Sequence, residues 1–452
     1  MRYVQLHLPG PHDPLAVAGR LATAASQAGN DYLVYEHPDR RWVIAVDPVL
    51  DVSIDTRGLS IHVNGHTTTR QLGAFPFADL RRALLAATPI WAGTAYGWVA
   101  FEAGHINRHI TPPRSRGTDS GPLVRMMVPR TDVRLSSHTA VIRSTTTSGV
   151  VQVADLFTAP PPAPGRPWPV PVDADTHAQQ TFERHAAAAL HRIDGRALAK
   201  LVVSRAVAVP YPVDLLGSYL ASRAAVAEPA GSFLVSYGGA RAAGLSPEPL
   251  LDVHDDEIAT QAVAGTRGHT GSATDRIHAT DLSTDPTDLY DHAATLTAAR
   301  DDLADLCAPG TLTATRPLHV AAAGGVQQMT TGLQGTLRID RNGFDALAQV
   351  LPGLAAAGIP RAVAYAVVGE IEPARGLYGG ALVTAALDTG DLHAAIIQHA
   401  LITNPDGTAV LRTGAGLVTG SVPARAYHQT TQQLHDLACH ITPTEDAIAA
   451  AG

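Results

Sequence analysis

Short apolar runs, set apart by polar and turn-forming residues, dominate the first 155 residues of the chain. Runs of this kind bounded by Asp, Pro and Gly are typical of β-strands. Strands are predicted at 32–35, 42–46, 59–63, 95–101, 124–128 and 139–143. A helix is predicted near 77–87. The first third of the chain is therefore expected to be rich in strands.

From about residue 173, strand-like runs alternate with segments in which apolar residues recur every three or four positions. This recurrence is typical of amphipathic helices. Helices are predicted at 175–193, 214–224, 288–306, 343–351 and 359–368, with a last one opening at Pro423. Strands are predicted at 198–209, 233–237, on both sides of 244–248 (the second ending at 262–267), 311–321, 326–337, 381–386, 393–402 and 410–414. In the strand at 198–209, alternation places Lys200, Val202 and Ser204 on one face.

The segment 159–171 separates these two patterns. It contains seven prolines, which exclude a helix or a central strand. We interpret it as an extended connector over the surface, which need not divide independent domains.

Composition excludes several classes of protein. A hydrophobic content of 45% allows a sizeable core, and a net charge of −8 without a basic block argues against nucleic-acid binding. The two cysteines, Cys307 and Cys439, support neither a disulfide framework nor a cysteine-based zinc site. No signal peptide and no run of eighteen apolar residues is found, so we expect a soluble, cytoplasmic protein that does not bind membranes.

One charged residue stands out, because 32 arginines accompany a single lysine, Lys200. Arginine stays protonated, whereas a buried lysine can lose its proton and act as a base or nucleophile. Lys200 is therefore a candidate catalytic residue. Chance or a single salt bridge also explains a lone lysine.

Two other motifs offer chemistry near predicted strand ends. Pro247 and Pro249 hold Glu248 rigidly, as suits a general acid, although carboxylates are also common in turns. Gly265-Thr266 and the segment 414–416 end apolar strands with glycine, which lets a ligand approach closely or simply makes a tight turn.

Two polar motifs can be interpreted either as ligand-binding groups or as ordinary surface residues. Asp288, Asp291 and His292 share one face of a predicted helix, which could present oxygen ligands to a hard cation or could be a solvated face. Arg375 and Tyr378 lie in a glycine-rich loop and are good carboxylate-binding groups, although surface turns look the same.

Together these motifs resemble the chorismate-utilising enzymes, a family that includes salicylate, isochorismate, anthranilate and aminodeoxychorismate synthases. The matching segments, in the family's order and spacing, are 200–205, 244–248, 264–267, 288–292, 375–379 and 414–416 followed by Pro423. The segment 95–102 is most similar to the salicylate synthase branch. The resemblance runs from about residue 95 to 441.

The resemblance implies an α+β fold in which two large antiparallel β-sheets pack face to face, with helices outside and the active site between the sheets. It implies a single domain over 1–452, with a strand-rich part at 1–158, the connector at 159–172, a catalytic part at 173–442 and a tail at 443–452. The resemblance implies a lyase or isomerase. Its expected context is secondary metabolism, such as siderophore-like biosynthesis. Its expected partner is a small-molecule substrate, and a monomer or weak homo-oligomer is expected.

The resemblance also assigns roles. Lys200 matches the general base that activates water to attack C2 of chorismate, and Glu248 matches the general acid that protonates the departing C4 hydroxyl. Ala264 stands where the aminodeoxychorismate branch has a nucleophilic lysine, which disfavours that branch. The positions that match substrate-lining residues are Gly265, Thr266, Tyr378, Gly414 and Gly416.

The metal-binding positions depart from the family. The family holds Mg²⁺ with the second glutamate of a pair on each of two helices, which makes Asp291 and Gln429 the corresponding candidate ligands. The first members of the pairs are Asp288 and Ala426 here. A neutral amide oxygen binds a hard cation less well than a carboxylate does, so the sequence leaves open whether a Mg²⁺ site is retained.

The positions that bind substrate charges also differ. Gln398 replaces the arginine that clamps the pyruvyl carboxylate, and Gln433 replaces a lysine on the last helix. Gln328 stands in place of a histidine, and Arg361 in place of the lysine of a Gly-x-Pro-Lys motif. We expect Gln328 and Gln398 to line the substrate site.

Three functions remain open at this stage. The first is a salicylate or isochorismate synthase-like enzyme acting on chorismate or a chorismate-like molecule. The second is a metal-independent enzyme that uses Lys200 and Glu248 for elimination, addition or isomerisation of a less anionic substrate. The third is a non-catalytic binding protein.

Overall fold

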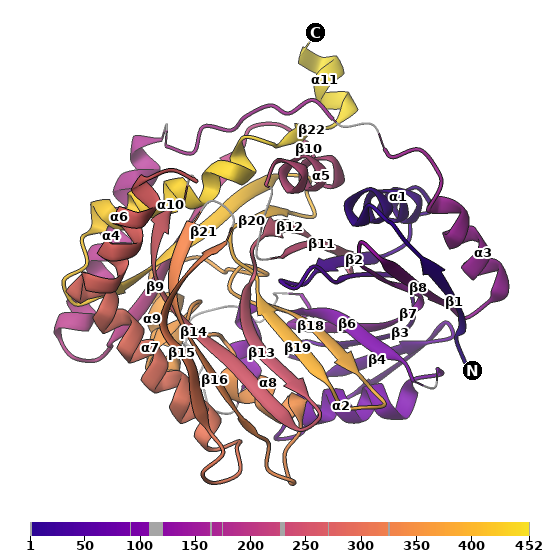
Figure 1. Ribbon diagram of the computed structural model, residues 1–452, viewed down its shortest axis with the longest axis horizontal. Helices are drawn as coiled ribbons and strands as arrows, with labels where there is room; N and C mark the ends of the chain where they lie inside the picture. Colours follow the sequence, from indigo (N-terminus) through magenta and orange to yellow (C-terminus); the bar gives the residue numbers. More distant parts are fainter. Residues whose placement is uncertain are drawn as a thin grey trace.

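Nearly all the β-strands belong to one antiparallel hydrogen-bonded network (Figure 1). The computed structural model describes residues 2–90, 92–107, 121–162, 165–173, 175–226, 231–269, 271–323 and 326–451. Within these residues, twenty strands form the network, and β10 (Val213–Asp214) pairs separately with β22 (Thr442–Pro443).

The network consists of two sheets that share two long strands, β3 (Trp42–Ile54) and β7 (Val124–Leu135). The first half of β3 pairs with β2 (Tyr32–Glu36), and its second half pairs with β4 (Leu59–Val63). The register between β3 and β7 shifts between Pro48 and Leu50. A bulge of this kind bends a strand, and the two sheets diverge there.

The first sheet runs in the order β1-β8-β7-β3-β2-β11-β12-β20-β21-β9-β17. Its further strands are β1 (Val4–Pro9), β8 (Thr139–Ser144), β11 (Ser232–Tyr237), β12 (Ala240–Leu245), β20 (Ala400–Thr403), β21 (Ala409–Val418), β9 (Lys200–Val209) and β17 (Gly358–Ile359).

The second sheet runs in the order β5-β4-β3-β7-β6-β18-β19-β13-β14-β16-β15. Its further strands are β5 (His66–Arg70), β6 (Thr94–Val99), β18 (Ala381–Ala386), β19 (Leu392–Ile396), β13 (Glu248–His254), β14 (Glu257–Gly268), β16 (Val326–Thr336) and β15 (Thr313–Ala323).

Three apolar clusters hold these layers together. One consists almost wholly of strand residues from both sheets, among them Leu33, Phe233, Tyr96 and Leu382, and it joins the sheets face to face. Another packs α1 (Pro14–Gln27), α5 (Leu215–Ala225) and α10 (Pro423–Ala438) on the first sheet. The largest packs α2 (Pro76–Ala87), α7 (Pro286–Ala304), α8 (Gly343–Val350) and α9 (Arg361–Ile371) mainly on the second.

The expected fold class is confirmed, since helices lie on the outside of the paired sheets (Figure 1). The predicted elements are found within a few residues, including α4 (Thr176–Asp194). The described part of 159–171 forms no helix or strand. The predictions missed α1, α3 (Thr147–Leu156), α6 (Thr274–Thr284) and a short helix in the tail, α11 (Glu445–Ala451).

Two predicted strands are wrong because each is two strands. The strand after 244–248 turns back at Asp255 and Asp256, whose φ values of 47° and 65° form a tight turn between β13 and β14. The strand at 393–402 breaks after Ile396, since β19 belongs to the second sheet and β20 to the first. Gln398 therefore lies where the chain crosses between the sheets.

Among the described residues, no helix has both the length and the apolar character that a membrane span requires.

Candidate active site

Lys200 opens β9 in the first sheet and points toward α7. Its side chain is 3% exposed. Its Nζ lies 2.7 Å from Oδ1 of Asp291 and donates a hydrogen bond of 3.2 Å to Oγ1 of Thr295. Asp291 and Thr295 are four residues apart on α7 and therefore share one face of that helix. A Cβ atom at Gly416 would lie 3.0 Å from Cε of Lys200, so a glycine there makes room for the amine.

Glu248 opens β13 in the second sheet, directly after Ser246 and Pro247. Nε2 of Gln398 donates a hydrogen bond of 3.1 Å to Oε2 of Glu248. Burial raises the pKa of the Glu248 carboxyl to about 7, because a charged carboxylate is poorly solvated there. The charge of Lys200 and the hydrogen bond from Gln398 oppose this rise, and the charge of Asp291 adds to it.

The structure therefore brings Lys200 and Glu248 to one interior region, although they belong to different sheets. The two charges influence each other, and Thr295, which holds the amine, lines the same small cavity as Glu248. A carboxyl that titrates near neutral pH can donate a proton, and an amine on the other side can accept one. The site can therefore support general acid–base catalysis.

The residues at the predicted metal position do not fit Mg²⁺. Asp291 is already paired with Lys200, and Gln429 offers a neutral amide. Asp288 accepts from Arg267 at 2.5 Å, and Ala426 has no ligand atom. Mg²⁺ needs hard oxygen ligands in near-octahedral geometry, and here no unpaired carboxylate is offered by these four positions.

A different group of possible metal ligands is found among the described residues. It consists of His254, Asp255 and Asp391, on exposed turns at the opposite end of β13 from Glu248. Its position does not support metal chemistry at Lys200 or Glu248.

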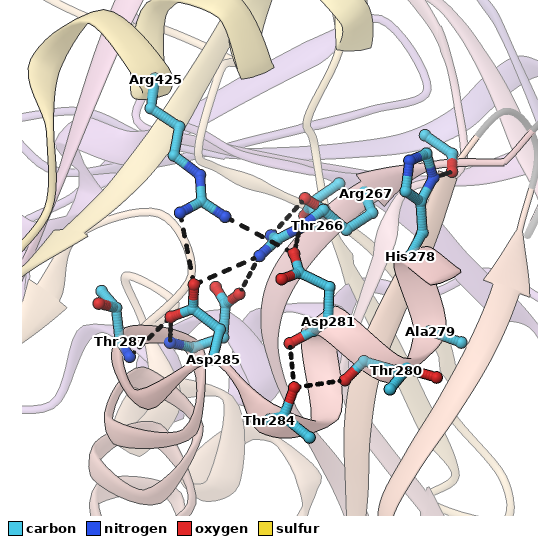
Figure 2. Close-up of polar contacts among 12 residues, drawn as sticks. Thr266, Arg267, His278, Ala279, Thr280, Asp281, Thr284, Asp285, Thr287 and Arg425 are labelled. Atoms are coloured by element: carbon cyan, nitrogen blue, oxygen red, sulfur yellow. Dashed lines mark hydrogen bonds and ion pairs between the residues drawn. The ribbon is translucent and has the colours of Figure 1, made fainter. Parts of the chain in front are cut away.

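Asp288 pairs instead with Arg267 at the end of β14. Figure 2 shows the ion pairs that Arg267 and Arg425 form there with Asp281 and Asp285. Arg267 contacts Asp281 at 2.7 Å, and Arg425 of α10 contacts Asp285 at 3.4 Å and Asp281 at 3.9 Å. The network ties β14, α6, α7 and α10 together beside the predicted substrate-lining residues.

The helix face with Asp288, Asp291 and His292 is not solvated, contrary to the simpler sequence interpretation. Asp291 is 8% exposed and His292 is 1% exposed. Nε2 of His292 lies 2.7 Å from Oγ1 of Thr331, so this histidine holds α7 to β16.

The predicted substrate-lining residues make the following contacts, of which Gly416 with Lys200 and Gln398 with Glu248 reach the acid–base pair. Gly265 has a φ of +69°, which favours glycine. Nε2 of Gln328 donates to Oγ1 of Thr266 at 3.4 Å. A Cβ at Gly414 would lie 2.5 Å from the hydroxyl of Tyr378, whose pKa burial raises to about 12.

Arg375, a candidate carboxylate-binding group, is held within the protein. It is 2% exposed and donates to Glu372, to the carbonyl of Ala356 and to the carbonyl of Val202. Arg361 similarly forms a two-pronged ion pair with Asp302. Gln433 accepts a hydrogen bond of 2.9 Å from Thr413. These side chains position strands and helices.

The sequence interpretation missed Thr295, Arg267 and Arg425 as parts of the site. Thr295 had a usable signal, because it lies one helical turn after Asp291. The contacts of Arg267 and Arg425 join segments far apart in the chain, and no local pattern marks them.

Comparison with known proteins gives matches over most of the chain. The family described as chorismate binding enzyme matches residues 30–438. The salicylate synthase of Mycolicibacterium paratuberculosis is 31% identical over 445 residues, covering 96% of this chain and 95% of that protein. Anthranilate synthase component 1 of Streptomyces coelicolor is 32% identical over 313 residues, covering 66% of this chain and 59% of that protein.

Two solved structures share the fold. Anthranilate synthase component I from Streptococcus pneumoniae aligns with a TM-score of 0.71 and 21% identity, covering 88% of this chain and 92% of its own. The menaquinone-specific isochorismate synthase from Escherichia coli aligns with a TM-score of 0.69 and 18% identity, covering 96% and 94%.

Proposed function

This chain belongs to the chorismate-binding enzyme family, and we propose that it is a lyase or isomerase of the salicylate and isochorismate synthase type. Its substrate is chorismate or a chorismate-like small molecule. The whole chain works as one unit, because β2 and β6 of the first part pair with β11 and β18 of the second.

One observation carries this proposal, namely the arrangement of Lys200 and Glu248. They extend from different sheets toward one interior region and influence each other electrostatically. General acid–base catalysis needs two such groups of different proton affinity on opposite sides of a substrate.

In the proposed reaction, Lys200 takes a proton from water that attacks the ring, and Glu248 gives a proton to the departing hydroxyl. Asp291 and Thr295 hold Nζ of Lys200 in place. Asp291 also stabilises the ammonium that forms when Lys200 takes up the proton. Gln398 orients the Glu248 carboxyl through its hydrogen bond.

A second function is favoured by the amides of the site. Gln398 contacts Glu248 and Gln433 contacts Thr413, so both bind protein groups. An amide binds a carboxylate less strongly than a charged side chain does. A metal-independent elimination, addition or isomerisation of a substrate with fewer carboxylates is therefore the alternative.

Product analysis after incubation with chorismate, with and without Mg²⁺, tests the proposal. We expect a new aromatic or isochorismate-type product from the wild type and from Gln334→Met, an exposed change on β16. Lys200→Arg and Glu248→Gln should abolish it. No chorismate loss would overturn the first function and leave the second, whose reaction must still depend on Lys200. Ligand binding that survives both substitutions, without turnover, would indicate the non-catalytic protein.

A further inference from the structure

The second sheet is split next to Glu248. β13 and β14 pair only at Asp252–His254 with Glu257–Ala259, close to their turn. Toward Glu248, β13 pairs with β19 and β14 with β16, and the register of β13 shifts between Pro249 and Leu251. In the split, Oγ1 of Thr260 donates a hydrogen bond of 2.7 Å to the carbonyl of Leu250. The gap is therefore closed by side chains in place of a ladder of backbone hydrogen bonds.

Two cavities meet at this split. A cavity of about 650 Å³ is lined by Asp39, Asp252 and His254, of which His254 is 72% exposed, so it reaches the surface. A smaller cavity of about 30 Å³ lies beside Glu248. Three residues line both cavities, namely Pro249, Thr260 and Gln261. The two cavities adjoin at these three residues, directly beside Glu248.

The smaller cavity suits water. Its volume corresponds to about two water molecules, since one needs roughly 10–15 Å³ of such space. A buried water also needs two to four polar partners. The cavity lining offers Glu248, Thr260, Gln261 and Thr295, with the Asp302–Arg361 ion pair on its wall.

A general acid must recover its proton in every turnover. In the proposed reaction the substrate stands between Glu248 and Lys200, and Gln398 occupies one carboxylate oxygen. The small cavity borders Thr295, the partner of Lys200, but it continues along the following turns of α7, past Ala299, Asp302 and Leu303, and so leads away from Lys200. A return path on the substrate side is therefore closed while substrate or product is bound. The split between β13 and β14 offers a second path.

We propose that Glu248 regains its proton from behind, through water in the small cavity and past Thr260 and Gln261, from the outer cavity. This inference rests on the proposed role of Glu248 as general acid. One proton leaves Glu248 for the departing oxygen, and one proton returns from solvent along the water. Only O–H bonds form and break on this path. Thr260 and Gln261 are positioning residues that hold the water.

A crystal structure at high resolution tests the path without an activity assay. The wild type and the control Gln334→Met should show ordered water in the cavity, hydrogen-bonded to Glu248. Thr260→Val with Gln261→Met removes both polar groups at the meeting point and should displace that water. If the double variant does not fold, Gln261→Met alone is used in its place and should displace the same water. A dry cavity in the wild type would overturn the proton route.

Rapid-quench kinetics at pH 6 tests the consequence. Glu248 starts protonated, so the first turnover needs no proton return. In the double variant we expect a first turnover within about twofold of the wild type and later turnovers about tenfold slower. This loss is below the 10²–10⁴-fold of removing an acid or base, because Glu248 itself remains. A purely structural defect would slow both phases equally and overturn the route, as would two unchanged phases.

The two proposals fail differently. A dry cavity in an enzyme that turns over its substrate would overturn the route alone. A hydrated cavity in a protein without any turnover would overturn the catalytic function and the route together.

Discussion

Two parts of the candidate site are built in different ways. The acid–base side consists of Lys200 and Glu248, and the anchoring side consists of the α10 positions 429 and 433 that correspond to the family's metal-binding and charge-binding residues. On the acid–base side, Lys200 is buried and Glu248 is half-buried, and specific partners hold both, namely Asp291, Thr295 and Gln398. On the anchoring side, Gln429 and Gln433 of α10 present neutral amides, and the hydrogen bond recorded for Gln433 goes to Thr413. The first side holds charged groups with specific partners, whereas the side chains at positions 429 and 433 are neutral.

This difference indicates that proton transfer depends on the acid–base side. A buried ion pair such as Lys200–Asp291 is costly to build unless its geometry is good and its hydrogen bonds are satisfied. The acid–base side meets that requirement. Neutral amides cost less to bury and bind anions more weakly. The contrast favours proton transfer by Lys200 and Glu248 on a substrate whose charges are held weakly.

The largest expected effect comes from removing proton transfer while keeping charge and shape. Lys200→Arg retains a cation beside Asp291, yet arginine does not give up its proton. Glu248→Gln retains the hydrogen-bonding shape. We expect each to lower kcat by about 10²–10⁴-fold, the usual range for a general acid or base. Steady-state kinetics checks this, with thermal unfolding as the control for folding. Activity close to wild type in either variant would contradict the acid–base role.

A second prediction compares stability on the two sides. Asp291→Asn leaves the buried cation of Lys200 without a carboxylate, and breaking such a pair costs about 3–5 kcal/mol. Gln429→Leu, on the anchoring side, should change the free energy of unfolding by only about 0.5 kcal/mol, as partly exposed changes usually do. Denaturant unfolding measures both. Equal effects would erase the contrast between the two sides.

The local part of this design could be read from the sequence. Alternation in β9 placed Lys200 and Ser204 on one face, and Glu248 was found between two prolines at a strand end. The Lys200–Asp291 pair could not be derived, since it joins strands and helices 91 positions apart in the chain. The crossing at Gln398 was hidden because Ile396, Ile397 and Leu401 continue one apolar run. The Lys200–Asp291 pair and the break at Gln398 both depend on which strands and helices lie side by side, and local periodicity does not encode this.

A third prediction sharpens the contrast by restoring charge to the anchoring side. Ala426→Glu with Gln429→Glu places two carboxylates one turn apart on α10, at the positions that correspond to the family's metal-binding pair. We expect Mg²⁺ to leave the unfolding of the wild type unchanged and to stabilise the double variant. At 100 times its Kd, the ion would add about 2.7 kcal/mol. Thermal unfolding with and without Mg²⁺, and Mn²⁺ titration by electron paramagnetic resonance, measure this. Tight Mn²⁺ binding to the wild type at Asp291 would contradict the structural argument.

A small effect is also expected at Gln433. Gln433→Leu removes the acceptor for the Thr413 hydroxyl, which keeps Nδ1 of His399 at 2.8 Å as a partner. One lost hydrogen bond costs about 1 kcal/mol. Denaturant unfolding and kcat/KM should both change little. A large loss of kcat/KM with stability intact would show that this amide binds substrate.

The central claim is that Glu248 is an acid that titrates near neutral pH. Its folded-state pKa of about 7 lies above the ordinary value of 4.5 for a glutamate. Its contribution to stability is therefore present below about pH 4.5 and is lost as the pH rises through about 7. A rate that needs the protonated carboxyl should fall over the same upper range.

Infrared titration of the Glu248 carboxyl tests this claim most directly, because it needs no substrate. The carbonyl band of the protonated acid is assigned by its absence in Glu248→Gln. If Glu248 is an acid with a raised pKa, this band disappears with a midpoint near pH 7. A midpoint near the ordinary value of about 4.5 would contradict it, because Glu248 would then be ionised at neutral pH and could not serve as the acid.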